Sequence, residues 1–186
     1  MIVATVPGVG NLCDLTADHL DGWNTIAADP DVHRWLNLQP RTNAQPAKSL
    51  ADLPAQVCAG ADGVTRRLDA VLVGKGDEVL AAVELKVYPC SGNHYGLMVD
   101  YAVAPGHRGH GLAAQLTSKV SEWITTEVPS AHVFIEVCSK NAASIATARI
   151  LSMAEVDVGE QVGCNIHSGG LHQCDRRAIR YCLGAH

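Results

Sequence analysis

Hydrophobic positions along the chain change their spacing, and the change separates predicted helices from predicted strands. The first group recurs at helical spacing, at Leu20, Trp23, Ile26 and Ala27. Thr16 is placed to cap this helix, which should stop near Asp29-Pro30 because the residue before a proline avoids the α region. A second helix is expected after Pro46, broken or kinked around Pro54 and ended by the segment 60–63.

After these helices, the spacing of apolar residues changes from one in every 3.6 residues to every second residue, as in strands. The predicted strands are Leu68–Val73, Val79–Val87, Leu97–Ala104, Val133–Val137, Val156–Val158 and Ala178–Leu183. Residues 74–78 join the first two as a hairpin. Helices are predicted over Ala113–Glu127, where Leu112, Leu116, Val120, Trp123 and Ile124 form one stripe, and over Ala142–Leu151. This order of helices, a strand meander and then strand–helix–strand predicts a single α/β domain over 1–186. Its sheet should be mixed, with helices on both faces. The connection through the helix between two parallel strands should be a right-handed crossover.

Composition narrows the function classes. The chain has 186 residues, of which 47% are hydrophobic and 18% charged, as in a globular protein. The net charge is −5 and the 14 basic residues are scattered, so no nucleic-acid partner is expected. We find no membrane span and no signal-like start. Seven irregularly spaced cysteines without a CxxC pair favour a reduced, cytoplasmic protein.

A glycine-rich segment, Val103–Ala113, joins a predicted strand to a predicted helix. Glycines let backbone N–H groups approach a ligand, and a helix N-terminus attracts anions, so this segment suits a phosphate or pyrophosphate. Arg108 adds a fixed positive charge. The spacing fits neither GxxxxGK[ST] nor the GxGxxG of a dinucleotide fold. Taken alone, the segment is equally well explained as a structural connector.

Three motifs in the same order resemble the GNAT N-acetyltransferase superfamily. The run Val-x-Pro-x-x-Arg-Gly-x-Gly-x-Ala resembles its acetyl-CoA pyrophosphate loop, with Arg108, Gly111 and Ala113 at the core positions. The segment 135–145 resembles its E-V-x-x-x-N-x-x-A/S junction of strand and helix. The segment 29–36 resembles a signature of the Rim-type branch, which contains ribosomal-protein N-terminal acetyltransferases and small-amine acetyltransferases. Together the motifs span most of residues 15 to 160.

The resemblance implies a mostly antiparallel sheet with one splayed parallel pair, and direct transfer of an acetyl group from acetyl-CoA to a primary amine. The acceptor would be a protein or peptide α-amino group or a small-molecule amine. The pantetheine would be held by backbone groups at Tyr101, Ala102 and Val103 and by the Asn141 side chain. The pyrophosphate would be held by Arg108, Gly109, His110, Gly111, Leu112 and Ala113.

The same resemblance implies the catalytic groups. Glu136 matches the position of a general base, and a surface strand carboxylate is the competing interpretation; Glu84 and Asp100 are alternative bases. Ser144 matches a serine that could protonate the leaving thiolate, and a residue at a helix start whose hydroxyl bonds the backbone is the competing interpretation. Tyr101 is a further candidate for the acid. The usual tyrosine acid is absent, because Ala148 occupies its position, and Ser152-Met153 replace the usual Gly-Phe.

Other interpretations stay open at this point. A noncatalytic acyl-CoA-binding sensor or scaffold would share the fold. The group Cys164, His167, His172 and Cys174 has ligand types for zinc, but its spacing matches no known motif and a polar loop explains it, so no metal is expected. Trp23 and Trp35 are interpreted as packing residues rather than a substrate platform. A monomer and a homodimer are both compatible with the sequence.

Overall fold

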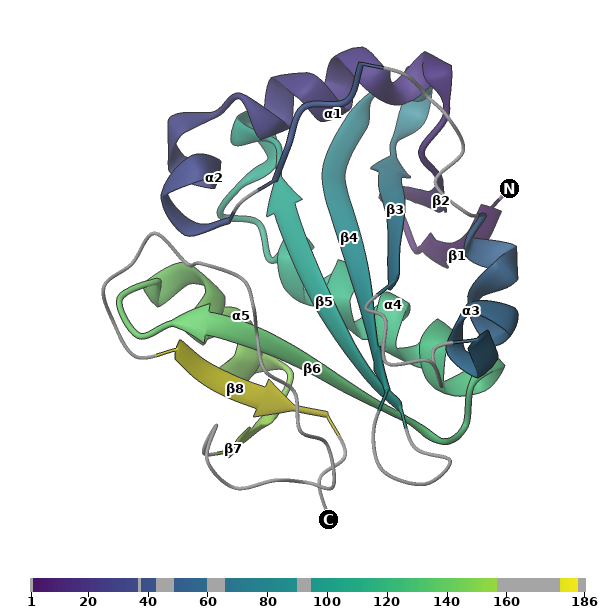
Figure 1. Cartoon of the computed structure of the whole chain (residues 1–186). Coiled ribbons are helices and arrows are strands. Elements are labelled where there is room, and N and C mark those ends of the chain that lie inside the picture. Colours follow the sequence, from purple (N-terminus) through teal and green to yellow (C-terminus); the bar gives the residue numbers. More distant parts are fainter. Residues whose placement is uncertain are drawn as a thin grey trace.

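One mixed sheet organises the computed structural model, which describes residues 2–36, 38–42, 49–59, 66–89, 95–156 and 178–183. In these residues eight strands are hydrogen-bonded in the order β1-β2-β3-β4-β5-β6-β8-β7 (Figure 1). The strands are β1 (Ile2–Val6), β2 (Gly10–Asp14), β3 (Arg66–Val73), β4 (Val79–Pro89), β5 (Tyr95–Val103), β6 (Ala131–Cys138), β7 (Ala154–Val156) and β8 (Ala178–Cys182). The helices are α1 (Leu20–Ala27), α2 (Pro30–Trp35), α3 (Leu53–Ala59), α4 (Leu112–Glu127) and α5 (Ala142–Ile150).

The pair β5 and β6 is parallel, whereas the other neighbouring strands in the sheet are antiparallel. Its register covers only four residue pairs, from Tyr95 with Ala131 to Met98 with Phe134. Beyond them the strands separate toward their C-terminal ends, as Figure 1 shows. The mixed sheet with one splayed parallel pair is therefore confirmed.

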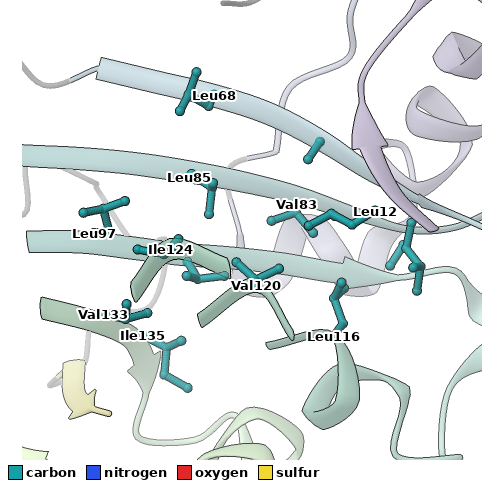
Figure 2. Packing of buried hydrophobic residues seen from close by; sticks show 14 of the residues in the cluster. Leu12, Leu68, Val83, Leu85, Leu97, Leu116, Val120, Ile124, Val133 and Ile135 are labelled. Atoms are coloured by element: carbon teal, nitrogen blue, oxygen red, sulfur yellow. The ribbon is translucent and has the colours of Figure 1, made fainter. Parts of the chain in front are cut away.

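The main core lies on the face of the sheet covered by α3, α4 and α5. Along α4, Leu116, Val120 and Ile124 repeat every four residues and are fully buried. Figure 2 shows them facing strand side chains that include Val83, Leu85, Leu97, Val133 and Ile135. Each such side chain contributes about 2 kcal/mol through burial. This packing fixes the N-terminus of α4 at the end of β5.

The opposite face is covered by α1 and α2, whose buried residues are Trp23, Ile26, Ala27 and Val32. Trp23 is 0% exposed, and its Nε1–H donates to the carbonyl oxygen of Gln39 at 3.0 Å. The expected packing role of Trp23 is confirmed. As predicted, α1 ends just before Asp29-Pro30; the chain then begins the short helix α2 at once, with Asp29 as its N-cap.

The structure differs from the sequence prediction at two places before β3. The N-terminal part is not only helical, because β1 and β2 form an antiparallel pair at the sheet edge. Only Val6 of β1 is buried, so this edge strand lacks the apolar alternation that identifies strands. Pro54 lies in the first turn of α3, where a proline costs no helical hydrogen bond, instead of breaking the helix.

The remaining predicted elements agree with the structure within a few residues. The predicted strand Val156–Val158 begins two residues earlier, as β7, and its last two residues lie outside the described part of the chain. Among the described residues, no helix is both long and apolar enough to cross a membrane.

Candidate active site

A cavity of about 530 Å³ lies where β5 and β6 separate. Its strand walls are Val99–Val103 and Ile135–Cys138. The helix α2 lines it from one face of the sheet, and the start of α4 and the helix α5 line it from the other. The opening is thus bordered by elements from both faces.

On the edge of β5 that faces the cavity, some backbone groups lie beyond the last residue that pairs with β6. The N–H of Ala104 donates to Leu80 of β4, 2.9 Å away. Because successive strand residues point their N–H groups to opposite sides, the N–H groups of Tyr101 and Val103 point away from β4, toward the opening. The β5–β6 register ends at Met98, so these groups have no ladder partner among the described residues of β6. A ligand in the cavity meets preorganised backbone donors there.

The glycine loop ends at an uncapped helix N-terminus. Gly109 and Gly111 have φ of +82° and +73°, a region that glycine adopts without strain. Gly111 is the N-cap of α4 and makes no side-chain cap, and the first turn holds no acidic residue. The first N–H groups of a helix have no intrahelical partner, so the start of α4 presents donors and the positive end of the dipole to the cavity.

Arg108 lies beside this loop but is already bonded to the protein. Its Nη2 is 2.7 Å from Asp29 Oδ2, and its Nε donates to the carbonyl oxygen of Val103 at 2.9 Å. Arg108 also lines the cavity. It is therefore held in place by α2 and β5, a role that the spacing of the loop did not suggest.

On the α5 side of the cavity, Asn141 caps the helix. Its Oδ1 accepts the backbone N–H of Ser144 at 3.2 Å. The hydroxyl of Tyr101 is buried and makes no well-aligned hydrogen bond to any described residue. Burial raises the pKa of Tyr101, and the nearby hydroxyls of Ser144 and Thr147 offset only part of that effect. The phenol therefore keeps its proton at neutral and moderately alkaline pH.

Three carboxylates lie at the same level of adjacent strands: Asp69 opposite Glu84, and Glu84 opposite Asp100. Lys86 bridges the last two, with Nζ 2.5 Å from Asp100 and 3.1 Å from Glu84. Asp100 lines the cavity and Glu84 does not. Glu136, on β6, also lines the cavity and is 7% exposed. Of the candidate bases, the cavity therefore brings together Glu136 and Asp100.

The cavity collects most of the residues predicted from the sequence. It is lined by Tyr101, Ala102, Val103, Arg108, Gly109, Gly111, Leu112, Ala113, Glu136, Asn141 and Ser144. His110 of the predicted loop is exposed and is not part of the lining. Ala148 is fully buried in the core and does not face the cavity.

Sequence reasoning did not identify the individual residues of α2 that form a wall of the cavity. Asp31, Val32, Trp35 and Leu36 line the cavity, so Trp35 borders the site in addition to packing against Arg34. The segment 29–36 resembles a family signature, and that resemblance does not by itself predict a helix. Its apolar residues Val32, Trp35 and Leu36 have helical spacing, but six residues are too few for a periodicity argument.

Some sequence-based expectations fall on other parts of the chain. The Cys/His group at 164–174 lies outside the described residues. Within the described ranges, no group of three or more His, Cys, Asp or Glu side chains is arranged to hold a metal ion. Cys138 is disulfide-bonded, which corrects the expectation that all the cysteines are reduced.

The cavity combines a helix N-terminus with a splayed pair of parallel strands. This is the arrangement implied by the resemblance of the sequence to acyltransferases. Residues 11–153 match the family model described as "Acetyltransferase (GNAT) domain", and the chain belongs to this family. No curated protein sequence matches the chain significantly.

Solved structures share the fold at low sequence identity. Spermidine N-acetyltransferase from Vibrio cholerae, in complex with CoA and spermine, has a TM-score of 0.61 and 16% identity, covering 92% of this chain and 93% of that one. Mycobacterium smegmatis RimJ, in complex with CoA-disulfide, has a TM-score of 0.59 and 18% identity, with coverages of 98% and 84%. RimL, a ribosomal L7/L12 alpha-N-protein acetyltransferase in complex with coenzyme A, has a TM-score of 0.59 and 14% identity, covering 98% of this chain and 97% of that one. The bound CoA in these neighbours agrees with the expected cosubstrate.

Proposed function

We propose that the protein transfers an acetyl group from acetyl-CoA directly to a primary amine. The observation that carries this proposal is the cavity between β5 and β6, into which the uncapped start of α4 opens at one end and Glu136 faces from β6. Acetyl-CoA supplies an activated thioester. The anionic diphosphate suits the N–H groups at Gly109–Ala113, because a helix N-terminus without an acidic first turn favours negative charge.

The amide of Tyr101 is proposed to donate to the thioester carbonyl oxygen as negative charge develops on it. This donor is fixed by the β4–β5 pairing and needs no reorganisation during the reaction. The amine nitrogen attacks the carbonyl carbon, the C–S bond breaks, and the nitrogen must lose a proton. Glu136 is the proposed acceptor of that proton, directly or through one water.

The leaving sulfur needs little assistance, because an ordinary thiol has a pKa of about 8.5. Ser144 and Tyr101 both line the cavity and are the proposed hydroxyl donors to the thiolate. Tyr101 is the stronger candidate of the two, because its buried hydroxyl lacks a well-aligned partner among the described residues.

Thiol release from acetyl-CoA in the presence of an amine panel tests the function. The panel includes spermidine and peptides with free α-amino groups, because the structural neighbours named above act on these two kinds of acceptor. The expected result is steady release of CoA with at least one amine, together with a product heavier by one acetyl group. Absence of turnover across the panel would contradict the enzyme.

A matched pair of variants separates cosubstrate binding from folding. Ala113 lies in the first turn of α4 and lines the cavity, whereas Ala142 lies in the first turn of α5 and does not. An aspartate in a first turn favours the helix dipole, so both Ala113→Asp and Ala142→Asp should fold. Only Ala113→Asp should abolish CoA binding in calorimetry, since it puts a carboxylate where the diphosphate is proposed to bind.

The alternative function is a noncatalytic acyl-CoA-binding module. One observation favours it: Ala148, at the position of the usual tyrosine acid, is buried away from the cavity. CoA binding that Ala113→Asp abolishes, without thiol release for any amine, would support this alternative.

A further inference from the structure

The guanidinium of Arg108 contacts two separate parts of the chain. Its Nη2 lies 2.7 Å from Asp29 Oδ2, and its Nη1 lies 3.6 Å from Asp31 Oδ2, both at the start of α2. Its Nε donates to Val103, the last residue of β5, at 2.9 Å. Because Arg108 itself belongs to the glycine loop, one side chain connects that loop to β5 and to α2.

Asp29 uses its two carboxylate oxygens for two different partners. Oδ1 accepts the backbone N–H of Asp31 at 2.8 Å and so caps α2, while Oδ2 pairs with Arg108. The hydrogen bond from the Asp31 backbone and the pairing with Arg108 lower the pKa of Asp29 below its ordinary value. Asp29 is therefore ionised throughout the neutral range, and only 13% of its side chain is exposed.

Few contacts hold α2 against the rest of the protein. The helix has six residues, and Val32 is its buried residue. A helix of this length is not stable by itself. Asp31, Trp35 and Leu36 face the cavity. The position of this wall therefore depends on the packing of Val32 and Leu36 and on the ion pair between Asp29 and Arg108.

The diphosphate is proposed to bind at the start of α4, on the other face of the sheet, so the α2 side of the cavity is left for the acceptor. We propose that Asp29 is a positioning residue, which through Arg108 fixes α2 as this acceptor-side wall and couples the wall to the occupancy of the glycine loop. The inference rests on the proposed transfer from acetyl-CoA. A diphosphate at the loop would place Arg108 between two anions, with carboxylates on one side and phosphate on the other. Each terminal guanidinium nitrogen has two N–H groups, so Arg108 can serve both sides at once. Filling the loop then restrains α2 further.

The variant Asp29→Asn isolates the ion pair, because asparagine caps a helix as well as aspartate does. Without the carboxylate, Arg108 keeps its full charge for the diphosphate while α2 loses its anchor. We expect the acetyl-CoA Kd to stay within about twofold or to become tighter. The KM of the acceptor should rise about fivefold, the upper range for one partly exposed ion pair. Amide hydrogen exchange in α2 should be slowed by CoA in the wild type and much less in the variant.

Two further variants provide controls. Asp29→Glu keeps the charge and should restore most of the acceptor KM, which a purely structural role of the cap would not explain. Asp21→Asn removes an exposed carboxylate from the first turn of α1 and should change none of these quantities. Unfolding in urea verifies that each variant is folded.

The outcomes separate this inference from the proposed function. If wild-type protein gives a flat CoA titration, the proposed function fails and the coupling fails with it. If wild-type protein binds CoA but Asp29→Asn shows wild-type exchange in α2 and an unchanged acceptor KM, only the inference is overturned. It is also overturned if Asp29→Asn weakens acetyl-CoA and acceptor binding equally, because that result indicates general damage to the site.

Discussion

Lys86 is bound to Asp100 at the edge of the cavity, with its Nζ 2.5 Å from Asp100 Oδ2. The same ammonium lies 3.1 Å from Glu84 Oε2, and the Lys86 side chain is only 14% exposed. Arg67 adds a contact of 3.1 Å to the other oxygen of Glu84. These carboxylates are thus compensated by Lys86 and Arg67 of the sheet and by Arg41, whose Nη2 lies 2.7 Å from Asp69 and 3.7 Å from Glu84.

Replacing Lys86 should destabilise the protein strongly. Lys86→Met leaves two poorly hydrated carboxylates facing each other, and we expect the free energy of unfolding to fall by about 2 kcal/mol. Lys119→Met removes an exposed lysine paired with Glu122 and should change the free energy of unfolding by less than about 0.5 kcal/mol. Urea denaturation measures both. Equal effects of the two substitutions would contradict the importance of the buried pair.

The contribution of Lys86 should also depend on pH in a defined direction. Burial by itself lowers the pKa of Lys86, but Asp100 and Glu84 outweigh it, so the pKa is raised. A raised lysine pKa stabilises the folded state below the unfolded value of about 10.4, and this stability is lost as the pH rises through the folded value. The difference between wild type and Lys86→Met should therefore be constant from neutral pH to about pH 10 and shrink above it. A difference that shrinks below pH 9 would contradict this assignment.

Gly111 and Gly8 allow a controlled test of the glycine loop. Both have φ of +73°, and in both cases no described atom lies within 4 Å of an added Cβ. Alanine should therefore cost each site the same backbone strain, about 1 kcal/mol of stability. Only Gly111→Ala displaces amides that face the cavity, and it should weaken CoA binding about tenfold, the equivalent of one hydrogen bond to a charged group. Similar CoA affinities for both variants in calorimetry would argue against the loop as the diphosphate site.

The dependence of kcat on pH tests the role of Glu136 as a general base. Glu136→Gln should lower kcat by about 100-fold at neutral pH, the usual range for loss of a general base. The loss should become smaller at high pH, where more of the amine is already neutral. Steady-state rates from pH 6 to 10 are the measurement. Wild-type rates for the variant at every pH would exclude Glu136 from the mechanism.

Tyr101→Phe should have opposite effects on stability and on activity. It removes a buried hydroxyl with no well-aligned partner among the described residues, so the free energy of unfolding should stay the same or rise by up to about 1 kcal/mol. If the hydroxyl protonates the thiolate, kcat should fall about tenfold, and more than in Ser144→Ala. A more stable variant with unchanged kcat would assign the proton transfer elsewhere.

Local chemistry explains which features could be predicted from the sequence. The stripe Leu116, Val120 and Ile124 and the turn at Gly109 and Gly111 are set by neighbours within a few residues, and these elements agree with the structure. The ion pair of Asp29 with Arg108 joins residues 79 positions apart, and no periodicity reports such a contact. The place of Trp35 in the cavity wall was not identified for the same reason, since it depends on where α2 is held and not on its composition.

The separation of β5 from β6 has a kinetic consequence. The cavity is bordered by α2 on one face of the sheet and by the start of α4 and α5 on the other, so a ligand held at α4 leaves the α2 side accessible. Two reactants can therefore occupy the protein together, each arriving by its own route. Initial-rate plots at several fixed acceptor concentrations should accordingly intersect, as for a ternary complex, and should not run parallel.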